Sequence, residues 1–463
     1  MLPDNVLLEI FNFYRMKYQV RDEWHFKWRP LVHVCRRWRE IVFASPHRLD
    51  LRIVCKHGTP VRENLGIWPA LPIVFEYQNY MTPNDEDNIL AALQHSDRVS
   101  HLKLHAVTGS LLGKMATVMQ RPFPVLTRLH IRSDGLARVL PGGFLGGSAL
   151  SLLQTILLSG VPFPTLPTLL ISTSDLITLE LKYIPPTGYI SPEVMVMSLA
   201  ALPRLESFTV EFQSVTSRPN QIPPPPATRT VLPALARFQF QGASEYLEAF
   251  VAQIDCPQMD RINIYYFNQL ADFQVAHLSQ FIDRSAGPEM TLIRHAEVIF
   301  SNDSVSFTLS PHENYPYSHL RQVDIICEGI DWQVSHMAQV LSQIPVALSR
   351  VVHLWLEMTT ASEKVGADDV EWLHLLHQFP TVRTLHVNWD LARHVAPVLE
   401  GQVEGTTGGM AAEVLPSIKL IWIGDQKLKK FKAARRLSGR PVTVCSKSKF
   451  NARIQSYVEK SFP

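Results

Sequence analysis

The chain of 463 residues is long enough for two or three compact domains, or for one extended repeat array. With 46% hydrophobic and 19% charged residues, the composition excludes a wholly disordered protein. The formal net charge of +2 gives no global field that would attract nucleic acid or an acidic membrane, so we expect neither as a partner.

Cysteine usage and the apolar stretches bear on the compartment. The five cysteines are scattered without a close pair, which argues against a disulfide framework or a zinc site and favours a reducing compartment. The most apolar stretch, residues 150–171, is interrupted by prolines, and the first ten residues are acidic where a secretory signal is basic. We therefore expect a cytoplasmic or nuclear protein without metal or cofactor.

Two short helices are predicted in the first fifty residues. Pro3 and Asp4 suit a first helical turn, after which apolar residues recur at helical spacing. A polar, aromatic-rich connector begins near Arg15, and Pro30 then starts a second apolar stripe. Two helices of this size cannot bury all their apolar residues against each other. From the pattern alone, a cap on the following domain and a docking module are equally favoured.

The particular residues carry a family resemblance. L-P-x-x-V-L-x-E-I-F at 2–11 and L-V-H-V-C-R-R-W-R-E-I-V at 31–42, followed by Ser45-Pro46, closely resemble an F-box. They look most like the F-box-like segment of fungal F-box proteins, in which an aromatic-rich insert separates the two helices. The resemblance implies docking onto a Skp-type linker subunit of a cullin-RING ubiquitin ligase. By motif position, it implies linker contacts from Leu2, Pro3, Leu7, Ile10, Leu31, Val34, Cys35 and Trp38.

From residue 99 onward one pattern recurs: apolar, two residues, apolar, one residue, apolar. Its twelve copies start 23 to 36 residues apart, and such a period is typical of leucine-rich repeats, whose strands bury their apolar side only by stacking on neighbours. The copies begin at Val99, Leu126, Leu153, Leu176, Leu205, Leu235, Met259, His295, Leu320, Val351, Val382 and Ile418, and the one at His295 is a poorer match because its first position is not apolar.

The segments between copies, such as 331–344 and 368–379, carry helical spacing, which predicts parallel strands joined by right-handed crossovers. The fold class is therefore α/β: an F-box-like helical module (1–50), a junction and solenoid start (51–98), an irregular leucine-rich-repeat solenoid or horseshoe (99–425) and a C-terminal cap (426–463). The asparagine or cysteine expected three residues after the third apolar position is missing in every copy, which predicts unequal repeats. Two α/β domains that mimic the pattern remain an alternative.

Catalytic motifs are absent from the sequence. It has no phosphate-binding glycine loop, no nucleophile elbow and no metal-ligand spacing among its histidines, so we expect a non-catalytic protein. Candidate substrate contacts are strand residues that point away from the core, where a tryptophan on a rigid strand is a plausible hot spot. They are Arg128, Arg237, Arg261, Trp355, His386 and Trp422.

The favoured interpretation is a substrate-recognition adaptor of a Skp–cullin–F-box ubiquitin ligase for ubiquitin-dependent degradation, acting by proximity. The repeats would recruit an unknown protein substrate. One alternative is an interaction scaffold outside any ligase, in which the N-terminal helices only cap the solenoid. Another is a small-ligand receptor or an enzyme with a pocket under the long loops.

Overall fold

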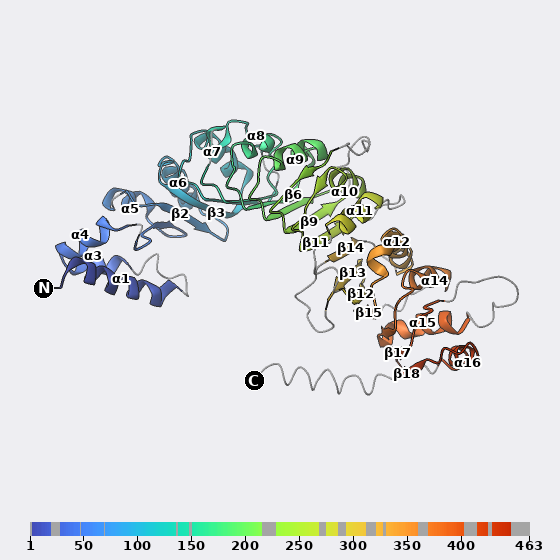
Figure 1. Cartoon of the computed structure of the whole chain (residues 1–463). Coiled ribbons are helices and arrows are strands. Elements are labelled where there is room, and N and C mark those ends of the chain that lie inside the picture. The colour runs from blue at the N-terminus through green and yellow to red at the C-terminus, as the bar shows by residue number, and fades with distance from the viewer. Residues whose placement is uncertain are drawn as a thin grey trace. The chain divides into compact units, whose positions relative to one another are not determined.

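The computed structural model describes residues 2–19, 28–46, 48–68, 70–135, 138–147, 151–214, 228–267, 275–285, 293–311, 321–326, 330–359, 369–401, 414–424 and 428–445. The chain forms two compact units (Figure 1). Unit 1 consists of Met1–Ile190 and Met197–Gln213, and unit 2 of Ser191–Val196 and Ser214–Pro463.

The described part of unit 1 begins with the helices α1 (Asp4–Gln19), α3 (Arg29–Val34) and α4 (Arg36–Ala44). The first helix extends beyond the predicted connector start at Arg15, where the Nε atom of Arg15 donates to Asn12 Oδ1 at 3.1 Å. The second predicted helix is divided at Cys35, whose backbone is extended. The Cys35 Sγ accepts from the backbone N–H of Trp38 at 3.5 Å and so caps α4.

The sheet of unit 1 is parallel and follows the order of the chain. Its strands already begin in the predicted junction, and Figure 1 shows helices along one face of them. The strands are β1 (Ile53–Cys55), β2 (Ile73–Tyr77), β3 (Val99–Val107), β4 (Arg128–Ser133), β5 (Thr155–Ser159), β6 (Thr178–Ile184) and β7 (Ser207–Phe212). The helices are α5 (Val61–Ile67), α6 (Pro83–Leu93), α7 (Gly109–Val118) and α8 (Leu166–Leu170), while α9 (Pro192–Leu199) contains the division between units.

Unit 2 holds a second set of strands and helices. In sheet order its strands are β9 (Arg237–Gly242), β11 (Arg261–Tyr266), β14 (Arg321–Ile326), β13 (Ser304–Ser310), β12 (His295–Phe300), β15 (His353–Met358), β16 (Thr384–Val387), β17 (Leu420–Ile423) and β18 (Thr443–Cys445), and β8 (Thr230–Val231) pairs with β10 (Ile254–Asp255). Its helices are α10 (Ser244–Val251), α11 (Ala276–Arg284), α12 (Ile330–Ser342), α13 (Pro345–Leu348), α14 (Asp369–His377), α15 (Trp389–Gly401) and α16 (Lys429–Leu437).

The prediction that all strands are parallel is wrong in unit 2. β13 pairs antiparallel with both β12 and β14, and β14 returns to pair in parallel with β11. Only residues 301–303 separate β12 from β13, which suits a hairpin and is far too short for a crossover. The pattern missed β13 because its apolar residues Val305, Phe307 and Leu309 alternate along the strand, without the repeat's spacing.

The second and third apolar positions of all twelve copies fall on strands. In β3 and β15 these residues are Leu102 with Leu104 and Leu354 with Leu356, and all four are at most 1% exposed. Each such side chain contributes about 1.5–3 kcal/mol by burial. The α/β repeat architecture predicted from the spacing is therefore confirmed, with the hairpin as its main irregularity.

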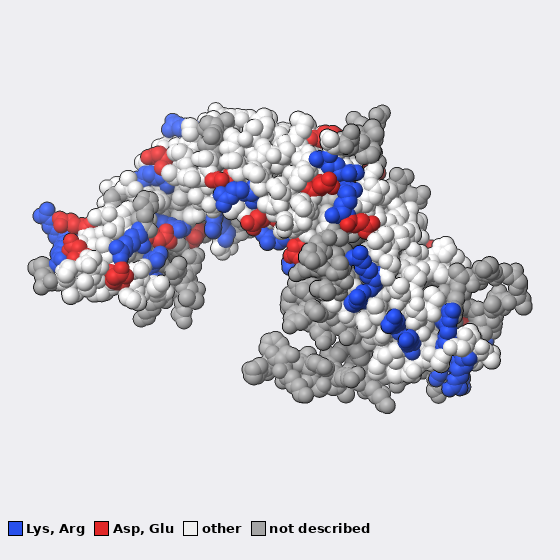
Figure 2. Space-filling model, in the orientation of Figure 1, with Lys and Arg blue, Asp and Glu red and all other residues white. Residues whose placement is uncertain are grey.

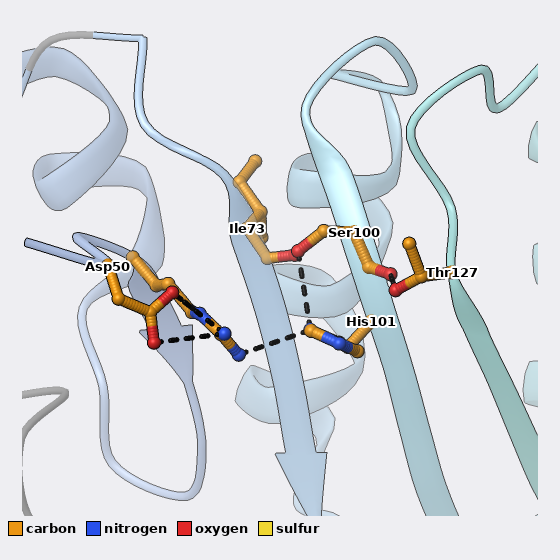
Figure 3. A network of polar contacts seen from close by, with 6 residues as sticks. Asp50, Ile73, Ser100, His101 and Thr127 are labelled. Carbon is orange, nitrogen blue, oxygen red and sulfur yellow. Dashed lines mark hydrogen bonds and ion pairs between the residues drawn. The ribbon is translucent and has the colours of Figure 1, made fainter. Parts of the chain in front are cut away.

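Hydroxyl side chains link the backbones of neighbouring repeats in part of unit 1 (Figure 3). The Ser100 hydroxyl donates to the carbonyl of Ile73 at 3.2 Å, and the Thr127 hydroxyl donates to the carbonyl of Ser100 at 3.0 Å, each 27 residues back. In unit 2, Asn388 Nδ2 donates to the Met358 carbonyl at 2.7 Å. Neighbouring repeats thus satisfy each other's backbone groups by varied local means.

The described part of the C-terminal cap is α16 and β18, which pairs with β17. Arg435 is buried on α16, and its Nη2 donates to the carbonyls of Val414 and Leu415 at 2.8 and 2.7 Å. These bonds fix the segment before β17. Residues 446–463 of the predicted cap lie outside the described part of the chain.

Candidate functional site

The N-terminal helices form a small packed module. Leu7 and Phe11 of α1 are buried, and Phe11 makes an edge-to-face contact with Trp38 of α4, with ring centroids 4.8 Å apart. Arg37 Nη2 donates to the Leu2 carbonyl at 2.6 Å and also contacts Asp4. One face of α1 is therefore held against α4 by both packing and charge.

The other face of α1 is apolar and exposed. Leu2, Val6, Ile10 and Phe13 recur at helical spacing and are 50%, 38%, 44% and 71% exposed. We call these four residues the apolar stripe. Val34, at the end of α3, is also exposed. Single exposed apolar residues are ordinary, but a contiguous set on one helix face marks an interaction surface.

The predicted linker contacts therefore divide into two groups. Leu7 and Leu31 are buried and Trp38 is half-buried, so these three serve packing within the module. The exposed group is Leu2, Pro3, Ile10, Val34 and Cys35. Sequence reasoning missed Val6 and Phe13 as surface residues, although their spacing from Leu2 and Ile10 places them on the same face.

The module is joined to the first repeat by aromatic packing. Trp28, which is fully buried, contacts Phe43 of α4 and Trp68 at the end of α5, with ring centroids 6.1 and 5.3 Å apart. The Arg29 guanidinium lies over the Trp68 ring, 5.9 Å from its centroid. The helices thus do cap the repeats, through a surface separate from the apolar stripe.

A cavity of about 460 Å³ opens on the strand side of unit 1. Arg15 near the end of α1 lines it together with Asp50 and Arg52, which precede β1, and residues of β2 to β5 form the remainder. Its polar and charged lining is Arg15, Asp50, Arg52, Glu76, His101, Lys103, Arg128, His130 and Thr155. The cavity therefore adjoins both the helical module and the repeats.

Positive charge predominates in this cavity. Four Lys or Arg side chains face two carboxylates, a difference of +2. Arg52 is neutralised by Asp50 through bonds of 2.8 and 3.0 Å and lies 3.5 Å from His101 Nδ1 (Figure 3). Within the described residues, no carboxylate lies within ion-pair distance of Arg128 or Lys103.

The cavity's charge is reflected in one of its two histidines, His130. Burial is the largest cause that lowers the pKa of His130 to about 4, and the neighbouring His105, Lys103, Lys182 and Arg132 contribute in the same direction. His130 is therefore neutral at neutral pH, and its surroundings disfavour any added positive charge. Of the predicted substrate contacts, only Arg128 lies at this site.

In unit 2, three predicted contacts form one row. Trp355 of β15, His386 of β16 and Trp422 of β17 are register partners. The Trp355 and His386 rings stack at 4.4 Å and 20°, and those of His386 and Trp422 lie 6.1 Å apart at 7°. Both tryptophans are half-buried. The register therefore places these three residues side by side on neighbouring strands, and we call them the aromatic row.

His386 within the aromatic row is buried and neutral. Burial lowers its pKa to about 4, and the nearby His353 and His295 act in the same direction. Glu297 pairs with Trp355 on the next strand, and burial beside Glu357 raises the pKa of Glu297. The row therefore offers flat aromatic surface with little charge, in contrast to the cavity of unit 1.

Arg237 and Arg261 form a separate pair. They are register partners on β9 and β11 and are both exposed. No register pairing joins them to the aromatic row, which lies on β15 to β17. The six predicted substrate contacts therefore form three separate groups.

Among the residues that the structure describes, no group of three or more His, Cys, Asp or Glu side chains could hold a metal ion. Within the same part of the chain, no helix combines the length and apolarity that a membrane crossing requires.

Comparisons with known proteins give no family. No protein-family model matches the chain, and no curated protein matches it. A solved structure that is similar is the leucine-rich repeat-containing protein LegL7 from Legionella pneumophila. It shares 13% sequence identity over 85% of this chain and 99% of that chain, with a TM-score of 0.26. A likeness at that score carries no conclusion about function.

Proposed function

We propose that this chain is a non-catalytic adaptor of a cullin-RING ubiquitin ligase. Its N-terminal helices dock a Skp-type linker subunit, and the strand faces of its repeats hold a protein substrate. The proposal rests on one observation: α1 buries Leu7 and Phe11 on one side while leaving the apolar stripe exposed on the other. A helix that served only as a cap would gain nothing from this second apolar face.

The mechanism requires no covalent step by this protein. A substrate held on the repeats is brought close to the ubiquitin-charged enzyme that the linker recruits, which raises its effective concentration. The repeat strands are rigid and present their outward side chains at fixed spacing, as a recognition surface requires. The aromatic row is one such surface, because aromatic anchors on rigid elements dominate protein interfaces.

A second function, a scaffold outside any ligase, is favoured by a different observation. The cluster of Trp28, Phe43 and Trp68 shows that the helices pack on the first repeat. A capping role alone explains that aromatic cluster and the burial of Leu31. It does not explain why the apolar side chains of Ile10 and Val34 are exposed.

The test is binding of a purified Skp-type linker subunit to the full chain, measured by calorimetry. We compare the wild type with Ile10→Asp plus Val34→Asp, both on exposed positions, and with the control Met197→Asp, an exposed apolar residue on α9. We expect micromolar or tighter binding by the wild type and the control, and a loss of at least tenfold in the double variant.

Thermal melting establishes that all three proteins are equally folded. Leu7→Asp is unsuitable as a test, because Leu7 is 4% exposed and the change would unfold the module. No binding by folded wild type would leave the scaffold function in its place.

A further inference from the structure

The cavity of unit 1 has the charge and the size of a binding site for a specific chemical group. Its volume of about 460 Å³ is within the range of small-molecule sites, roughly 300–1,000 Å³. We propose that it binds the phosphate monoester of a ligand, held by Arg15, Lys103 and Arg128. The inference deepens the proposed function by giving the repeat face a ligand class, and it rests on that face being the recognition surface.

The charge balance favours a dianion. The four cationic side chains exceed the two carboxylates by two. A phosphate monoester carries about −1.5 to −2 charges at neutral pH, so it would neutralise this excess, whereas one carboxylate would leave part of it. Asp50 forms two hydrogen bonds with Arg52, and the second carboxylate, Glu76, is the register partner of Lys103. Arg15, Lys103 and Arg128 then still exceed the one remaining carboxylate by two charges.

The geometry places these cations on different elements. Arg128 and Lys103 stand on the neighbouring strands β4 and β3, where His101 pairs with Arg128 and Lys103 pairs with His130. Arg15 comes from α1 and donates to the neutral amide of Asn12 at 3.1 Å. Guanidinium groups that approach from separate elements suit the tetrahedral arrangement of phosphate oxygens, because each presents a planar fork of donors.

Apolar residues also line the cavity. Leu157 of β5 is half-buried at one side, in register with His130 of β4. An inorganic anion gains nothing from contact with an apolar side chain, whereas the carbon chain of an organic phosphate can pack against Leu157. The phosphate can belong to a phosphorylated side chain of a protein or to a small organic phosphate, and the experiment separates these sources.

The experiment titrates the full chain at physiological ionic strength by calorimetry. The probes are inorganic phosphate, O-phosphoserine and a blocked Gly-Gly-phosphoserine-Gly-Gly peptide with its unphosphorylated form. The test variant is Arg128→Gln plus Lys103→Gln. The matched control is Lys429→Gln plus Arg436→Gln, which removes two exposed charges from α16 of unit 2. We expect saturable binding of phosphorylated probes, weakened at least tenfold in the test variant and less than twofold in the control.

The two sources give different affinities. A peptide that binds at least tenfold more tightly than O-phosphoserine assigns the group to a protein, and equal affinities assign it to a small organic phosphate; both support the site. Equal binding of the unphosphorylated peptide, equal weakening in test and control variants, or no saturable binding by folded wild type would overturn it.

The ring of His130 provides an independent readout. Because nearby cations help to lower its pKa, a bound dianion should raise that pKa, which NMR titration of the imidazole would detect. A purely structural role for Arg128 and Lys103 would not produce this ligand-dependent shift. Linker binding should be the same in the test variant and the wild type, so failure here is distinguishable from failure of the linker experiment.

Discussion

The strand faces of the two units are built on one apolar pattern but present opposite chemistry. From β3 to β6 of unit 1, the row of register partners is Lys103, His130, Leu157 and Glu180. From β12 to β17 of unit 2, it is Glu297, Trp355, His386 and Trp422. Stacking requires only the helix-facing side of each strand to stay apolar, so the outward side is free to differ between units.

Surface charge follows the same division in part. Figure 2 shows Lys and Arg interspersed with Asp and Glu over unit 1, and a group of Lys and Arg with few acidic neighbours around α16. Lys429, Lys430 and Arg436 on that helix are exposed, whereas Arg435 is buried as a structural anchor. A basic run in the sequence therefore contains both solvated and structural residues.

The largest expected effect tests whether the shared pattern stabilises both units equally. Leu129→Ala in β4 and Leu354→Ala in β15 each truncate a fully buried residue at the same repeat position. Each should lower the free energy of unfolding by about 2–5 kcal/mol, from lost burial plus a cavity. Urea unfolding followed by circular dichroism measures both. If one variant lowered the free energy of unfolding by less than about 1 kcal/mol, the repeat pattern would not form the core of that unit.

The second prediction separates the units by pH. Glu248 in unit 2 is buried and accepts from the backbone N–H groups of His277 and Leu278 at 2.7 and 2.9 Å, yet burial raises its pKa from 4.5 to about 7. Its contribution to stability is complete below about pH 4.5 and is lost as pH rises through about 7, a change on the order of 3 kcal/mol.

His130 in unit 1 has the opposite dependence. Its pKa falls from 6.5 to about 4, so its contribution is present above pH 6.5 and is lost as pH falls toward 4. Urea titrations between pH 4 and 8 should show Glu248→Gln flattening the alkaline side and His130→Gln flattening the acidic side. Identical pH profiles in wild type and both variants would contradict the two assignments.

The third prediction concerns the close spacing of neighbouring repeats in unit 1. Gly160 follows β5 with φ +67°, and a Cβ there would lie 2.7 Å from the Ser133 carbonyl oxygen. Gly160→Ala should therefore cost about 1–3 kcal/mol in urea unfolding, from strain and a backbone clash. Gly143, which has nothing within 4 Å, is the matched control and should change little on substitution by Ala. Equal stability of the two variants would show that the repeats can move apart here.

The smallest expected effect is at the surface. Arg204 and Asp175 join neighbouring loops of unit 1 at 3.1 Å, with side chains 60% and 41% exposed. Arg204→Ala should change the free energy of unfolding by less than about 0.5 kcal/mol, because solvent screens the pair. A thermal melt at low and high salt checks this, and a shift as large as that of the core variants would give surface ion pairs a structural role.

Local spacing in the sequence determined the repeat strands and the first two helical segments, and it placed Trp355, His386 and Trp422 at the same outward position of their copies. These features follow from neighbour-to-neighbour stacking, in which each strand's register is set by the same apolar positions. The spacing also places Val6 and Ile10 on the same face of α1, because residues four apart share a helix face.

Only the tertiary structure decided the rest. The order β11-β14-β13-β12 depends on a hairpin whose strands pair across the repeat, and the division of Leu7 from Ile10 into core and surface depends on where α4 packs. The cavity depends most strongly on folding, since Arg15, Arg52 and Arg128 lie far apart in the chain and meet only when α1 packs near the first strands. Short-range periodicity contains no information about such encounters between distant segments, and the outward charges that give the cavity its chemistry are not constrained by the repeat.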